Sequence, residues 1–164
     1  MKRLVLAAAT LALFAAALPA SAADDDALTR MALCSDSWLE WSKGDPARFK
    51  TFAEHVKANF ASHGNDPYAL PKAKLTVAGL PVTQAFPDSV GMGVGFSLTV
   101  DATFDDTRKA VEKTLGKTLP HCESDEGMRS CELAIAPQRT VMLMADDKPG
   151  SRQTLVGCYY LYEK

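Results

Sequence analysis

Short runs rich in apolar residues and bounded by polar turns dominate the C-terminal part of the chain, and they predict β-strands. Residues 131–135, 139–145 and 153–162 form three such runs, and the polar segment 146–151 separates the last two. Connections this short join neighbouring antiparallel strands. We therefore expect residues 119–164 to form an antiparallel sheet on which the rest of the chain packs.

The N-terminal part of the chain has a longer hydrophobic period. Apolar side chains recur there every three or four positions, at Leu28, Met31, Cys34, Trp38 and Trp41. This spacing predicts an amphipathic helix with Cys34 on its buried face. Asp45 is a favoured N-cap and Pro46 a favoured first residue of a second helix, which we expect to end near Gly64. The tight connection predicts an N-terminal antiparallel helix pair.

The middle of the chain predicts three further strands and one helix. The strands are expected at 74–78, 82–86 and 94–100, after a loop at 65–71. Thr103 and Asp106 resemble a capping box with aspartate in place of glutamate, and Gly116 is expected to end the helix that follows. This order of helices and strands predicts a single α+β domain over residues 23–164, with helices packed on a mostly antiparallel β-sheet.

The first 22 residues have the features of a secretory signal peptide. Lys2 and Arg3 precede an almost unbroken apolar run at 4–18, and a proline and the small-residue segment 20–22 follow it. The run is shorter than the roughly 20 apolar residues that cross a membrane as a helix. We expect cleavage after Ala22, no stable membrane anchor, and a mature protein that is periplasmic or secreted.

Removal of this segment makes the chain more acidic. It takes away two basic residues and no acidic ones, so the formal net charge changes from −2 to −4. An acidic chain is a poor partner for nucleic acid or for an anionic membrane surface. A charged partner of this protein is therefore expected to be basic.

Four cysteines in an exported chain predict disulfide bonds, because the compartment is oxidising. Of the three possible pairings we favour Cys122–Cys131, since a hairpin turn at 125–127 would bring these two residues level. That pairing leaves Cys34 with Cys158, which would join the first helix to the last strand. The sequence thus predicts two disulfides and no free thiol.

The sequence contains no catalytic signature and predicts no metal and no cofactor. It has no Gly-x-Ser-x-Gly nucleophile elbow, and paired cysteines leave no thiol nucleophile. Gly91, Gly93 and Gly95 lack the spacing of a dinucleotide-binding loop. Met142 and Met144 could be copper ligands, but their apolar neighbours favour a central strand that is buried on both faces.

Acidic turns and C-terminal tyrosines are the candidate binding residues. They are Glu123, Asp125, Glu126, Asp146, Asp147, Tyr160 and Tyr162. Carboxylates in two turns are suited to a basic partner. Tyrosine combines an apolar ring with a polar tip, which is typical of a sheet face that is only partly covered.

These features favour a non-enzymatic protein-binding domain in the cell envelope, such as an inhibitor or immunity protein against a toxin or hydrolase. Small exported α+β domains with two disulfides and no catalytic motif occur among such proteins, which is a likeness of class and not of motif. Two alternatives remain open, a periplasmic protein that binds a small ligand or metal, and a hydrolase without a known motif.

The sequence makes one prediction about processing. The exported protein should begin at Ala23, because the apolar run and the small residues at 20–22 are typical of a cleaved leader. Intact-mass measurement of the exported protein checks this. A retained leader or a lipid adduct would contradict it.

Overall fold

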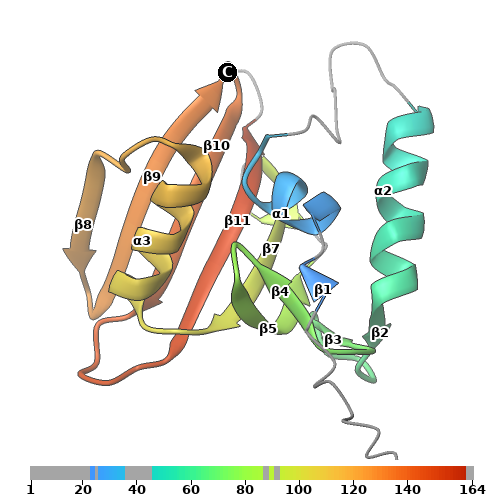
Figure 1. Ribbon diagram of the computed structural model, residues 1–164, viewed down its shortest axis with the longest axis horizontal. Coiled ribbons are helices and arrows are strands. Elements are labelled where there is room, and N and C mark those ends of the chain that lie inside the picture. Colours follow the sequence, from blue (N-terminus) through green and yellow to red (C-terminus); the bar gives the residue numbers. More distant parts are fainter. Residues whose placement is uncertain (1–22, 25, 36–45, 87–88, 91–92, 162–164) are drawn as a thin grey trace, which may run out of the picture.

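The computed structural model describes residues 23–24, 26–35, 46–86, 89–90 and 93–161 (Figure 1). The elements are β1 (Ala23–Asp24), α1 (Asp26–Ala32), α2 (Pro46–Asn59), β2 (Phe60–Ser62), β3 (Ala69–Pro71), β4 (Leu75–Val77), β5 (Leu80–Phe86), β6 (Ser89–Val90), β7 (Gly93–Asp101), α3 (Phe104–Leu115), β8 (His121–Asp125), β9 (Met128–Ala136), β10 (Arg139–Asp146) and β11 (Gln153–Leu161). The main path through the sheet is β1-β4-β5-β7-β11-β10-β9-β8. Apart from the parallel pair β1 and β4, its neighbouring strands are antiparallel, which confirms the α+β class.

One face of the central sheet forms the hydrophobic core. Its side chains stand in rows across the strands: Phe96 lies opposite Cys158, and Cys158 lies opposite Val141. These three residues are fully buried. Helix α1 contacts β7 and β11, and α3 contacts β10 and β11, so both helices cover this face (Figure 1).

The opposite face of the sheet is only partly covered. Val141 and Leu143 of β10 point into the core, whereas Met142 and Met144 on the other face are half-buried. The expectation that this strand is buried on both faces is therefore wrong. The physical reason is that α1 and α3 both pack on the same side of the sheet.

The first helix is shorter than predicted, because α1 ends at Ala32. Cys34 follows it with a left-handed φ of 56°. Its N–H donates to Met31 O, and the N–H of Ser35 donates to Arg30 O at 2.9 Å, which is a Schellman ending of the helix. Cys34 is thus fully buried as predicted, but from the turn after the helix and not from its face.

The remaining N-terminal predictions are mixed. Trp38 and Trp41 lie outside the described residues, as does the connection between the first two helices, so the antiparallel helix pair stays a prediction. Helix α2 packs on the core through Phe52, whose ring meets that of Phe96 edge-on at 5.3 Å. The end predicted for this helix is wrong, since Phe60–Ser62 forms β2 and pairs with β3 in the predicted loop.

Helix α3 has the predicted caps. Thr103 Oγ1 accepts a hydrogen bond from the N–H of Asp106 at 3.2 Å, and Gly116 ends the helix with a φ of 62°. Glu112 ties the helix to the segment before β8, because its carboxylate accepts from the N–H of Leu119 at 2.9 Å and from Arg108 at 3.0 Å. The Leu119 N–H, ahead of Arg108, holds the pKa of Glu112 below its ordinary value.

Both predicted disulfides are present. Cys34–Cys158 joins the end of α1 to β11, and Cys122–Cys131 joins directly opposed residues of β8 and β9. The chain has no free cysteine. Two disulfides indicate an oxidising compartment outside the cytoplasm.

The two bridges should differ in their contribution to stability. In the chain-entropy model, a bridge over 124 residues stabilises the fold by about 5 kcal/mol and one over 9 residues by about 3 kcal/mol. We expect the Cys34→Ala/Cys158→Ala variant to lose more free energy of unfolding than the Cys122→Ala/Cys131→Ala variant. Denaturant unfolding of both variants checks this, and an equal or larger loss in the second would contradict it.

Candidate functional site

The fold brings the two predicted acidic turns to one end of the sheet. The N–H of Asp147 donates to Gly127 O at 2.8 Å, and Ser124 Oγ donates to Asp147 Oδ2 at 2.7 Å. These bonds join the β8–β9 turn to the β10–β11 turn. We call this region the acidic end, formed by Asp105, Glu123, Asp125, Glu126, Asp146 and Asp147.

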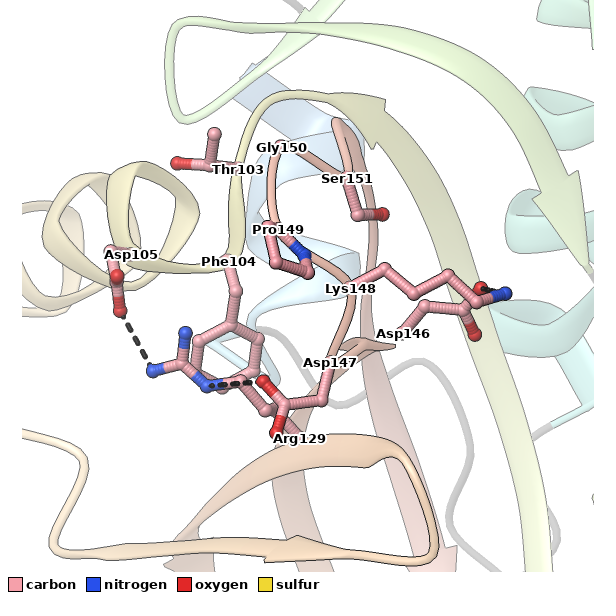
Figure 2. Close-up of a pocket in the computed structure, with 10 residues that line it drawn as sticks. All are labelled: Thr103, Phe104, Asp105, Arg129, Asp146, Asp147, Lys148, Pro149, Gly150 and Ser151. Atoms are coloured by element: carbon pink, nitrogen blue, oxygen red, sulfur yellow. Dashed lines mark hydrogen bonds and ion pairs between the residues drawn. The ribbon is translucent and has the colours of Figure 1, made fainter.

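Arg129 of β9 lies between Asp105 and Asp147 of the acidic end (Figure 2). Its Nη2 donates to Asp105 Oδ1 at 2.9 Å, and its Nε lies 4.0 Å from Asp147 Oδ1. The guanidinium carbon stands 4.4 Å from the ring centroid of Phe104. The hydrogen bond and the charge of Arg129 hold the pKa of Asp105 below its ordinary value. The arginine therefore joins the start of α3 to β9.

A hollow of about 320 Å³ opens beside Arg129. Its walls are the residues that Figure 2 shows: Thr103, Phe104, Asp105, Arg129, Asp146, Asp147, Lys148, Pro149, Gly150 and Ser151. Arg129 already faces two carboxylates, and Lys148 Nζ donates to Asp146 Oδ2 at 3.0 Å. Both cations of the hollow are thus neutralised within the protein, so it offers an anionic ligand little net attraction.

The candidate carboxylates fall into two groups. Asp146 and Asp147 belong to these internal contacts. Glu123, Asp125 and Glu126 are exposed, and in the described part of the chain none of the three forms an ion pair. Glu126 and Gly127 have φ values of 49° and 80°, which are typical of a tight type I′ turn. The hairpin thus holds three uncompensated negative charges on a defined backbone.

The tyrosines do not extend this surface. Tyr160 is only 3% exposed and belongs to the core, so its prediction as an exposed contact is wrong. The reason is that it lies on the same face of β11 as Cys158, which the helices cover. Tyr162 lies outside the described residues.

A second polar cluster was not expected from the sequence. His63 Nδ1 lies 2.8 Å from Asp66 Oδ2, and the hydroxyl of Tyr68 lies 3.2 Å from the same nitrogen. The rings of His63 and Tyr68 stack with centroids 5.3 Å apart. Hydrogen bonds from His63 and then Tyr68 hold the pKa of Asp66 below its ordinary value. The turn formers at 64–67 are the sequence signal that these side chains could meet.

The His63 cluster resembles part of a catalytic triad, in which a carboxylate orients a histidine toward a nucleophile. The described residues place no serine, threonine or cysteine side chain in hydrogen-bond contact with His63. Asp66 and Tyr68 both meet its Nδ1, so the described contacts fit a structural turn.

The described residues include no group of three or more histidine, cysteine, aspartate or glutamate side chains arranged to hold a metal ion. None of the helices in those ranges combines the length and the hydropathy that a membrane crossing requires.

Replacement of Arg129 by glutamine should raise the pKa of Asp105. The folded protein holds this pKa below the unfolded value, so the pairing stabilises the fold above the unfolded pKa and is lost as the pH falls through the folded pKa. Carboxyl NMR titration of Asp105 measures the change. Arg152→Gln is the matched control, since Arg152 pairs with Asp101 and should leave Asp105 unaffected. An unchanged Asp105 titration in Arg129→Gln would contradict the proposed cause.

The chemistry of the acidic end is the basis on which a function can be proposed for this protein. No protein-family model, no curated protein and no solved structure matches the chain.

Proposed function

We propose that this is an exported, non-enzymatic protein that binds another envelope protein with a basic surface, as an inhibitor or immunity protein does. The observation that carries the proposal is the β8–β9 hairpin, where Glu123, Asp125 and Glu126 are exposed and lack ion pairs in the described residues. The signal peptide predicted at 1–22 supports export to the periplasm or beyond, and the two disulfides agree with it.

Rigidity of the hairpin favours binding. The Cys122–Cys131 bridge fixes β8 to β9, and the Ser124–Asp147 hydrogen bond fixes the hairpin to the neighbouring turn. A surface that is already ordered loses less conformational entropy when a partner docks. Like charges on one surface also raise the rate at which an oppositely charged partner arrives.

The arrangement of side chains gives weaker support to the two alternatives, a small-ligand-binding protein and a hydrolase. A small anionic ligand would find both cations of the Figure 2 hollow already paired with aspartates. A hydrolase would need a nucleophile beside a base, and the described contacts of His63 are with Asp66 and Tyr68. Protein binding requires only the exposed carboxylates that the hairpin presents.

Zero-length cross-linking tests the proposal. A carbodiimide joins carboxylates to lysine amines that touch them, so a bound basic protein should be captured at 123–126 in an envelope extract. Mass spectrometry of the cross-linked peptides should place the link there, and the Glu123→Gln/Asp125→Asn/Glu126→Gln variant should lose it. Recovery of no partner, or of links only at other carboxylates, would contradict the proposal.

Charge reversal gives a second, kinetic test on the captured partner. Glu123→Lys should slow association by about tenfold at low salt and weaken its salt dependence, because steering depends on local charge. Glu54→Lys on α2 is the matched control, since it makes the same change of charge on another exposed glutamate. Equal effects of the two substitutions would show that net charge alone acts and that the hairpin is not the contact.

A further inference from the structure

Strand β8 is an edge strand of the sheet, and two residues of the acidic end, Glu123 and Asp125, lie on it. It pairs with β9, and no other strand of the described residues pairs with it. Its residues from Cys122 to Asp125 are exposed. An edge strand of this kind offers free backbone donors and acceptors to a further strand.

The register shows which backbone groups are free. Cys122 and Cys131 lie directly opposite each other with Cα atoms 4.0 Å apart, the short spacing of a pair that exchanges no backbone hydrogen bonds. Bonded and non-bonded pairs alternate along an antiparallel ladder. The residues of β8 bonded to β9 are therefore His121, Glu123 and Asp125. The N–H and C=O groups of Cys122 and Ser124 point away from the sheet.

The side chains define what could lie against this edge. Glu123 and Asp125 stand on the half-covered face of the sheet, opposite to the face of Cys122 and Ser124, and Glu132 of β9 extends this acidic face. None of the three forms an ion pair in the described residues. Directly opposed residues on neighbouring strands have Cβ atoms about 5 Å apart, so opposite charges there attract. A strand with basic side chains at every second position is complementary.

A second copy of the chain is a poor occupant. Only one antiparallel register lets Cys122 and Ser124 of each copy pair with those of the other. That register places Glu123 directly opposite Glu123 of the second copy, and like charges at this position destabilise the pair.

We propose that a basic, extended segment of the partner protein adds to the edge of β8 as an antiparallel strand. This deepens the function proposed above and rests on it. The backbone of Cys122 and Ser124 exchanges hydrogen bonds with the added strand, and Glu123 and Asp125 pair with basic side chains at alternate positions. The Cys122–Cys131 bridge keeps the edge strand in place before the partner arrives.

The probe is a synthetic peptide of alternating lysine and threonine residues. On binding, amide hydrogen exchange at Cys122 and Ser124 should slow by about tenfold or more, because their N–H groups become hydrogen-bonded. The N–H of Glu123 already bonds to β9 and serves as the internal reference. With lysine opposite Glu123 and Asp125, the backbone N–H groups of the threonines point toward β8 and those of the lysines point away from it. Methylation of the threonine amides should therefore abolish binding, whereas methylation of the lysine amides should leave the affinity unchanged.

Two variants of the protein complete the test. Ser124→Pro removes the outward N–H and no bond of the ladder, so it should weaken peptide binding by about tenfold. Ser124→Ala is the comparison variant: it also loses the hydroxyl bond to Asp147 but keeps the N–H, and should therefore lose much less affinity for the peptide than Ser124→Pro does. The methylated peptides give the answer with the parent protein if Ser124→Pro does not fold.

The outcomes separate this inference from the proposed function. Salt-dependent binding without exchange protection at Cys122 and Ser124, or equal affinity for both methylated peptides, would overturn strand addition and leave a charged docking surface. If the protein forms a dimer that Ser124→Pro dissociates, a second copy of the chain pairs with β8. That result would also overturn the addition of a partner's strand. No binding of the lysine peptide at low salt would count against both.

Discussion

Burial of a single face of the antiparallel sheet is the constraint on which this structure depends. The rows that run through Phe96, Cys158 and Val141 need a cover, and α1 and α3 provide it from the same side. The Cys34–Cys158 bridge fixes the end of α1 to the centre of this face, and the guanidinium of Arg139 donates to Cys34 O at 3.3 Å. On the opposite face, Met142 and Met144 of β10 remain half-buried, since neither α1 nor α3 packs there.

This arrangement determines where charge can appear at the surface. Helix α3 packs on β10 and β11, and its first turn reaches β9, where Asp105 meets Arg129. The β10–β11 turn joins the same contacts through Asp147. Carboxylates of α3 and of this turn therefore act within the fold. Those of the β8–β9 hairpin lie beyond the reach of Arg129 and stay exposed.

The proposed function assigns binding and stability to different members of one acidic group. The paired aspartates hold a helix, a strand and two turns together, so their replacement would disturb the frame. Glu123 and Asp125 stand on a strand that a disulfide already holds, and they can change charge without loss of a described contact.

The sequence by itself determined the features that depend on neighbouring residues. Strand alternation, the 125–127 turn and the Thr103 cap set the α+β class and the Cys122–Cys131 bridge, because each is settled within a few positions of the chain. Tertiary structure alone decided which face of β11 is covered, and hence that Tyr160 is buried. It also decided that Arg129 neutralises Asp105, a contact across 24 positions, and so which carboxylates remain free. The burial of Tyr160 and the Arg129–Asp105 contact depend on how the helices pack on the sheet, and local periodicity does not predict that packing.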